Sequence, residues 1–126
     1  MQVLKTKKFD GFCQDHGIAD DKLVQAIKEV DEGSVDANLG AGLVKKRIPR
    51  DGAGKSGGFR TIIVHKIGKR AIFLHAFAKN ADSNIDKKTL ENLKLLAKSY
   101  NSLSNAEIAT AIEGGKFVEV KYEDKI

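Results

Sequence analysis

Residues that could bind phosphate are concentrated in one stretch of the chain, residues 45–60 (KKRIPRDGAGKSGGFR). Its basic side chains are Lys45, Lys46, Arg47, Arg50, Lys55 and Arg60. The stretch contains a single acid, Asp51. Such a cluster attracts the phosphates of a nucleic acid whatever its sequence, by Coulomb attraction and by the release of condensed counterions. Polyanion binding is therefore our first hypothesis for this chain.

The excess of positive charge is confined to one region. Residues 43–80 contain ten Lys or Arg and one acid, a net charge of +9. The remaining residues contain twelve basic and sixteen acidic side chains, a net charge of −4. The formal net charge of +5 is therefore predicted to come from one basic pole on an otherwise acidic protein.

The glycines in this stretch raise the question of a nucleotide-binding loop. Gly54, Lys55 and Ser56 match the end of a P-loop, but the first glycine of that motif would fall on Pro49. Strand-like residues follow instead of a helix, so no helix N-terminus would meet a phosphate. ATP or GTP binding is therefore not expected. The glycines either let backbone N–H groups approach a phosphate or supply positive φ angles in a loop.

Three histidines occur, His16, His65 and His75, and their spacing does not indicate a zinc site. His75 is the best placed of the three, because the hairpin described next sets it one residue pair from Arg60 and Phe77. An aromatic ring beside cations can stack a nucleobase, as in the binding of single-stranded RNA. Phe77 fits this role and also fits the edge of a core.

The two strongest strand signals are residues 59–67 and 70–77, rich in Ile, Val, Phe and Thr. Gly68 and Lys69 between them predict a two-residue hairpin turn that begins with glycine. The predicted pairs are Arg60 with Phe77, Ile62 with His75, and Val64 with Phe73. This register fixes which side chains share a face of the sheet.

One face of the predicted hairpin should belong to the core, and the other should be the working face. The core face carries Thr61, Ile63, Ile72, Leu74 and Ala76, together with His65. The second face carries Arg60, Lys66, His75, Phe77 and Lys79, mixed with Ile62, Val64 and Phe73. We infer that polyanions bind on the second face.

The segments before the hairpin are predicted to be mainly helical. A short strand or coil leads into a first helix that Gly17 ends, and a second helix begins at Asp20 and Asp21 and ends before Gly33. Residues 33–42 are small and typical of turns. Residues 43–48 then form a strand that Pro49 ends, because proline has no N–H to donate.

Helical periodicity returns after the hairpin. Asp86 is predicted to cap a helix over residues 87–100, and Ser104 and Glu107 have the spacing of a capping box that begins a shorter helix. Residues 117–122 close the chain as a strand. The sum is an α+β fold with a small antiparallel sheet.

Composition places the chain among globular proteins. Its 126 residues suit one domain, and 41% hydrophobic with 31% charged residues argues against disorder. A lone Cys13 cannot form an internal disulfide. We find no apolar leader and no membrane-spanning segment in the sequence, and expect a cytoplasmic protein with no membrane association.

The run from Lys45 to Asn80, followed by a leucine-rich helix, a short helix and a Gly-Lys-Phe-Val-Glu-Val strand, resembles the RelE/ParE superfamily of bacterial toxins, specifically its RelE-like, HigB-type branch. The resemblance extends from about Lys5 to Val120. It implies one RelE-like toxin domain over residues 1–126, with helices packed on one face of an antiparallel sheet and a basic concave surface on the other. It also implies the toxin of a type II toxin-antitoxin pair, neutralised by a cognate antitoxin protein.

For RelE-like toxins the implied activity is cleavage of mRNA at the ribosome, without a metal or other cofactor. The implied catalytic residues are Arg60, Lys79, His75 and Tyr122, with the two cations on phosphate charge and the other two as proton-transfer groups. The implied RNA-binding residues are Lys45, Lys46, Arg47, Arg50, Lys55 and Phe77. The chain departs from some relatives because it lacks their histidine and tyrosine cluster after the last strand.

A second hypothesis is a non-catalytic toxin or binding protein with the same fold, such as a ParE-like gyrase inhibitor or a nucleic-acid binder. The two differ in their use of the basic pole, which an RNase needs as a cleft for RNA. The free toxin is expected to be a monomer, because none of the predicted helices has a second apolar stripe.

Overall fold

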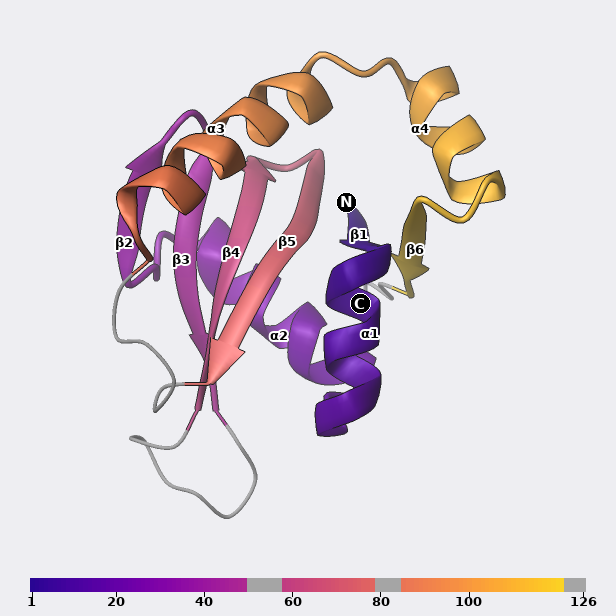
Figure 1. Ribbon diagram of the computed structural model, residues 1–126. Coiled ribbons are helices and arrows are strands. Elements are labelled where there is room, and N and C mark those ends of the chain that lie inside the picture. Colours follow the sequence, from indigo (N-terminus) through magenta and orange to yellow (C-terminus); the bar gives the residue numbers. More distant parts are fainter. Residues whose placement is uncertain (50–57, 79–84, 122–126) are drawn as a thin grey trace.

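The computed structural model describes residues 1–49, 58–78 and 85–121 (Figure 1). Its strands are β1 (Gln2–Thr6), β2 (Ala37–Gly40), β3 (Leu43–Ile48), β4 (Phe59–Lys66), β5 (Arg70–Ala78) and β6 (Phe117–Val120). Its helices are α1 (Lys7–His16), α2 (Asp20–Asp31), α3 (Lys87–Asn101) and α4 (Asn105–Glu113). Within this described part, none of the helices is long and apolar enough to span a membrane.

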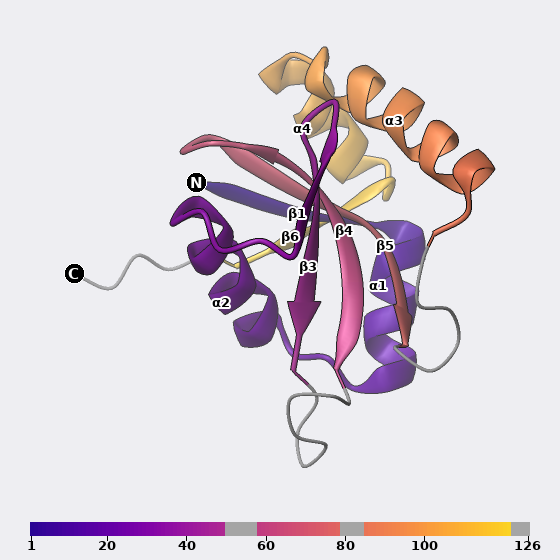
Figure 2. The same ribbon diagram turned by 90° about the vertical axis from the view of Figure 1, so that its left-hand side faces the viewer.

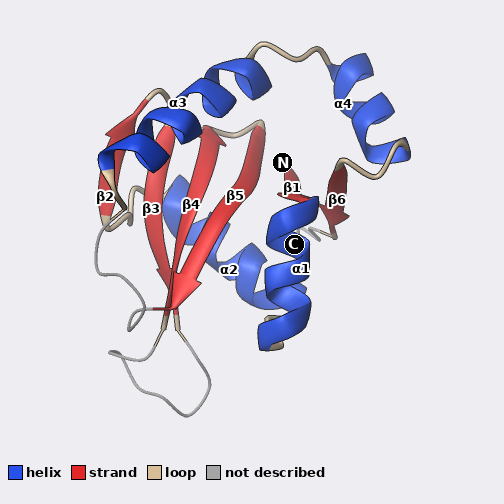
Figure 3. Ribbon diagram, in the orientation of Figure 1, coloured by secondary structure: helices blue, strands red, loops and turns tan. Residues whose placement is uncertain are grey.

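The strands form one sheet in the order β2-β3-β4-β5-β1-β6 (Figure 3). Neighbouring strands are antiparallel except β1 and β5, which run parallel. The predicted α+β fold is confirmed. The sheet is antiparallel apart from this one pair, and helices pack against both of its faces, not against one as the resemblance implied. The structure adds β2, which lies within the segment predicted to be turns.

Helices α1 and α2 share one hydrophobic core with the sheet, and α3 and α4 share a second. Figure 2 shows α2 and α3 on opposite sides of β3 and β4. The first core includes Phe9, Leu23 and Ile27 from the helices, packed on Ile63 and Phe73 from the sheet. The second includes Leu93, Ala97 and Ile108, packed on Leu43, Val64 and Ile72. In Figure 1, α3 crosses β3, β4 and β5 near the end at which β4 turns into β5, and no described helix crosses the other end on this side.

The β4–β5 hairpin differs from the prediction at two points. Lys66 pairs with Arg70, so the loop has three residues, with Gly68 in the left-handed region at φ 69°. Leu74 is an extra residue in β5, because Ile62 pairs with His75 whereas Ile63 pairs with Phe73. Such a bulge shifts the register by one residue.

The two differences cancel beyond the bulge. The predicted pairs of Arg60 with Phe77 and of Ile62 with His75 are confirmed, whereas Val64 pairs with Ile72 and not with Phe73. Up to the bulge, the residues of β5 therefore lie on the opposite face from the one predicted, whereas those of β4 keep their predicted faces. Phe73 belongs to the core under α1 and α2, and Ile72 and Leu74 belong to the core under α3 and α4.

Most predicted helix ends are confirmed. Gly17 ends α1 in the left-handed conformation at φ 66°, and the Asp86 carboxylate accepts a hydrogen bond from the Thr89 backbone N–H at 2.7 Å. Ser104 and Glu107 form both bonds of the capping box. Helix α2 begins at Asp20 as predicted, but neither aspartate caps it: the N-cap is Ala19, without a side-chain bond, and both aspartates lie in the first turn.

A buried lysine joins the first two helices to the sheet. Lys5 in β1 is only 6% exposed, and its Nζ lies 2.7 Å from Asp10 Oδ1 in α1 and 3.3 Å from Asp20 Oδ1 in α2. Burial lowers the pKa of Lys5, but the hydrogen bond to Asp10 and the charge of Asp20 outweigh this effect and raise it above its ordinary value. Burial also raises the pKa of the neighbouring Cys13 thiol to about 11, so this cysteine is an unreactive core residue.

Two glycines should respond oppositely to substitution by alanine. A Cβ on Gly11, inside α1, would have nothing within 4 Å, whereas a Cβ on Gly58 would lie 2.5 Å from the Ile48 carbonyl oxygen. Gly11→Ala should stabilise the protein by about 0.5–1 kcal/mol through helix propensity. Gly58→Ala should destabilise it by about 1–3 kcal/mol because strands β3 and β4 must separate. Urea denaturation of both variants checks the signs, and equal signs would contradict this account.

Candidate functional site

Five predicted site residues gather on the part of the sheet that α3 leaves uncovered. In the β3–β4–β5 ladder, Arg47 pairs with Arg60 and Arg60 with Phe77, while Lys45 pairs with Ile62 and Ile62 with His75. Opposite residues of paired strands share a face, and Ile62 belongs to the core on the α3 and α4 side. The five therefore lie on that side of the sheet, and all are half-buried. We call Lys45, Arg47, Arg60, His75 and Phe77 the open basic face.

The open basic face places like charges together. Arg47 and Arg60 lie directly opposite each other, an arrangement that is unfavourable in a sheet. Strands β3, β4 and β5 contain no acidic residue. The Nη1 atom of Arg60 is buried and has no hydrogen-bond partner among the described residues. A buried donor that lacks a partner costs about 1–3 kcal/mol, and more when its group is charged. An anion bound over the side chains of this face would relieve both effects.

His75 and Phe77 lie beside these arginines on the neighbouring strand. Their rings are 6.0 Å apart between centroids and tilted by 44°. Burial, and to a smaller extent the positive charge of Lys8, lowers the pKa of His75 below its ordinary value of 6.5. The imidazole is therefore mainly neutral near pH 7 and able to accept a proton.

Lys46, predicted to bind RNA, does not lie with this group. Successive side chains of a strand point to opposite faces, so Lys46 lies under α2 and is 6% exposed. Its Nζ is 2.8 Å from Glu29 Oε1 and donates to the Ser34 carbonyl oxygen at 3.0 Å. Through these contacts Lys46 links β3 to α2 and to the segment that follows it.

Four other predicted site residues, Arg50, Lys55, Lys79 and Tyr122, lie outside the described residues. The glycines of residues 52–57, expected either to let backbone N–H groups approach a phosphate or to supply positive φ angles, also lie outside the described residues. Gly58, the last glycine of the run, is buried against Ile48 at the start of β4. Within the described ranges, no group of three or more His, Cys, Asp or Glu side chains could hold a metal ion.

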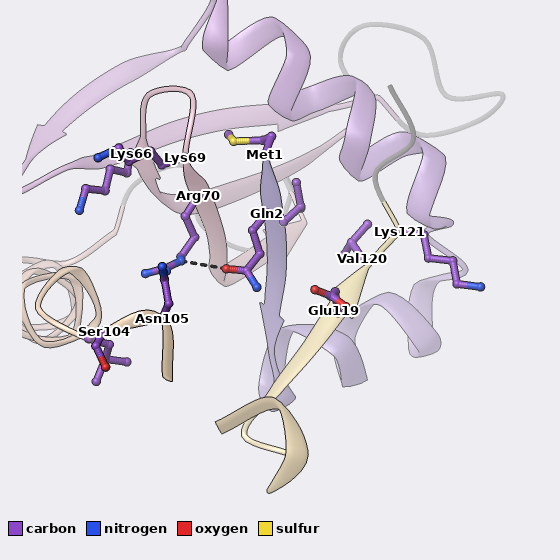
Figure 4. A pocket seen from close by; sticks show the side chains of 12 residues that line it. Met1, Gln2, Lys66, Lys69, Arg70, Ser104, Asn105, Glu119, Val120 and Lys121 are labelled. Atoms are coloured by element: carbon purple, nitrogen blue, oxygen red, sulfur yellow. Dashed lines mark hydrogen bonds between the residues drawn. The ribbon is translucent and has the colours of Figure 1, made fainter. Parts of the chain in front are cut away.

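The basic pole predicted from the sequence is divided between two ends of the hairpin. Lys66, Lys69 and Arg70 lie near the β4–β5 loop, and six residues of extended strand place Lys66 roughly 20 Å from Arg60. These three residues line a separate cavity of about 1000 Å³ (Figure 4). There Arg70 donates to Gln2 at 3.1 Å and to Asn105 at 2.8 Å. The hairpin connects the two basic groups in sequence but holds them apart in space.

The fold and the open basic face together define a small α+β domain with a cationic sheet surface, suited to an anionic partner. The family described as the RelE toxin of the RelE/RelB toxin-antitoxin system matches residues 1–120. The chain therefore belongs to the RelE toxin family, which confirms the resemblance at the level of the superfamily. Membership implies a role as a toxin and an antitoxin as its partner. A comparison with curated proteins gave no match.

Adjacent lysines of β3 should differ in their effect on stability. Lys46→Met should lower the free energy of unfolding by about 1–3 kcal/mol, because the Ser34 carbonyl and Glu29 lose their donor. Lys45→Met, on the half-buried opposite face, should change it by no more than about 0.5 kcal/mol. Urea denaturation at pH 7 checks the difference. Equal effects would contradict the division of faces.

The same pair predicts a dependence on pH. A hydrogen bond from Lys46, and a weaker one from Gln25, lowers the pKa of Glu29 below its ordinary value of 4.5. The carboxylate is favoured in the folded protein, so this stabilisation is complete above about pH 4.5 and is lost as the pH falls through the lowered pKa. The loss between pH 5 and pH 3 should be smaller in Lys46→Met than in the wild type.

Proposed function

We propose that this toxin is a metal-independent endoribonuclease that cleaves mRNA at the ribosome through its open basic face. The observation that carries the proposal is the buried, unpartnered Nη1 donor of Arg60 opposite a second arginine. A guanidinium with a spare donor in a half-buried site suits a phosphate oxygen, whose bonds to arginine are charge-assisted. We also propose that the protein belongs to the HigB-type branch and is located in the cytoplasm. The run of glycines and lysine before Phe59 supports the assignment to this branch.

Each residue of the open basic face has a role in the proposed reaction. The 2′-OH of one nucleotide attacks the adjacent phosphorus, and the bond to the 5′-oxygen of the next nucleotide breaks. His75 accepts the proton of the 2′-OH, while Arg47 and Arg60 stabilise the negative charge that develops on the phosphate oxygens. The products are a 2′,3′-cyclic phosphate and a 5′-hydroxyl.

The 5′-oxygen needs a proton as it departs. Lys79 and Tyr122, named from the sequence as a phosphate-binding cation and a proton-transfer group, are the candidate donors. Phe77 provides a surface for a base, and Lys45 binds the backbone phosphate further along β3. DNA lacks the 2′-OH and is therefore not a substrate for this chemistry.

Removal of the Arg60 guanidinium should abolish most cleavage. Arg60→Ala should reduce the rate by about 10²–10³-fold, the usual loss for one preorganised donor to a developing oxyanion. Lys69→Ala removes a cation from the far end of the hairpin and should leave the rate unchanged. The measurement is primer extension on mRNA in a translating extract. Equal cleavage by wild type and Arg60→Ala would refute the assigned site, while growth arrest with intact RNA and broken DNA would favour a gyrase inhibitor.

The pH profile tests His75 separately. The proton acceptor must be neutral, and burial lowers the pKa of His75 below 6.5, so wild-type cleavage should rise with pH along a limb whose midpoint lies below 6.5. His75→Ala should lose about 10²–10⁴-fold in rate, the usual contribution of a general base, together with this acidic limb. An unchanged limb in the variant would assign the titration to another group.

A further inference from the structure

A small cavity adjoins the open basic face at the edge of β5. β1 pairs with β5 only from Arg70 to Phe73, and after Thr6 the chain enters α1. From Leu74 onward, no described strand pairs with β5 on this side, and α1 runs beside it instead (Figure 2). A cavity of about 280 Å³ lies between them. Ligand pockets for larger, drug-sized molecules have volumes of roughly 300–1,000 Å³, so this one suits a single ring system.

One stripe of α1 lines the cavity. Lys8, Gly11, Phe12 and Asp15 recur at three- and four-residue steps and so share a helix face. The stripe therefore presents an ammonium donor, an aromatic ring and a carboxylate acceptor to one space. The Phe12 ring is held by a stack on His16, with centroids 4.1 Å apart, and by an edge contact with Phe59 at 5.4 Å.

Gly11 keeps this space open. Glycine weakens the interior of a helix, and crowding does not require it here, because a Cβ would meet nothing within 4 Å. On the opposite wall, the bulge at Leu74 interrupts the regular ladder of β5. Bulges commonly redirect side chains next to functional sites.

His75 connects the cavity with the open basic face. It lines the cavity beside Leu74, and its pairing with Ile62 places it on the same sheet face as Arg60. RNA held by its phosphate on Arg47 and Arg60 would therefore have a neighbouring base within reach of the edge of β5.

We propose that the cavity between α1 and β5 binds one nucleobase of the RNA, next to the phosphate on the open basic face. The inference rests on the proposed function for its substrate. A base has a flat face for Phe12 and a polar edge for Lys8 and Asp15. A free phosphate would be repelled by Asp15, and an apolar side chain would leave both charged groups unused.

The carboxylate gives the cavity a preference. Asp15 accepts hydrogen bonds, which the exocyclic amines of adenine, cytosine and guanine donate. Uracil has no exocyclic amine. Its only donor on that edge is the ring N3–H, whereas guanine presents two adjacent donors, N1–H and the exocyclic amine, to one carboxylate. We therefore expect uracil to bind about fivefold more weakly than guanine, the factor that corresponds to one hydrogen bond.

The test is titration of the isotope-labelled full chain with AMP, CMP, GMP and UMP, followed by NMR. The amide signals of Gly11, Phe12 and Leu74 should shift, most strongly with GMP. Gly11→Leu fills the cavity and should abolish these shifts, whereas Ala109→Leu adds the same side chain to an exposed position on α4 and should not. Asp15→Ala should remove the difference between GMP and UMP, and Glu91→Ala on α3 is its control. The spectra also report whether each variant is folded.

The outcomes separate this inference from the proposed function. Shifts confined to the strands of Arg47 and Arg60 would overturn the base site and leave the nuclease proposal standing. Shifts that persist in Gly11→Leu would also overturn it. If nucleotides bind as expected but the wild type cleaves no RNA, the cavity stands and the nuclease proposal fails.

Discussion

The alternation of side chains along β3 decides what each basic residue of this strand can do. Val44, Lys46 and Ile48 point toward α1 and α2. The lysine is thereby buried and needs a partner for its charge, which Glu29 supplies. Lys45 and Arg47 point the other way, onto the part of the sheet that α3 does not cross. Of these three consecutive residues, Lys46 therefore has a structural role, while Lys45 and Arg47 belong to the open basic face.

The sequence was sufficient for the elements and for part of the site. Helix ends followed from local chemistry, at Gly17, Asp86 and the Ser104 capping box, because a cap involves residues only a few positions apart. The pairing of Arg60 with Phe77 was also predicted, although by two errors that cancel. A three-residue loop and the bulge at Leu74 each shift the register by one residue, and neither has a signal as distinct as that of a two-residue glycine turn.

What could not be predicted depends on contacts between distant segments. The role of Lys46 requires α2 to lie across β3, although the apolar residues on either side of it at two-residue spacing were a usable signal. β2 was missed because Ala37–Gly40 is short and polar and is held by its pairing with β3. The basic pole is divided because β4 is long enough to hold its two ends apart. The Arg60 Nη1 donor has no partner because no acceptor in the described part of the chain lies within hydrogen-bond distance of it.

The open basic face and the opposite face of the sheet represent different solutions to the burial of charge. Under α1 and α2, Lys5 and Lys46 are buried with carboxylates at 2.7 and 2.8 Å, so their charges are compensated within the protein. On the open basic face the acidic counterparts are absent from all three strands, and two arginines oppose each other. A sheet selected for stability alone would replace one of them, because like charges opposite each other are unfavourable. An anion bound to Arg60 would give its buried Nη1 donor a partner, and any ligand that binds only the folded state stabilises it by mass action. The two faces therefore differ in one respect that matters for the proposed function: Lys5 and Lys46 already have carboxylate partners, whereas the buried Nη1 donor of Arg60 has none among the described residues.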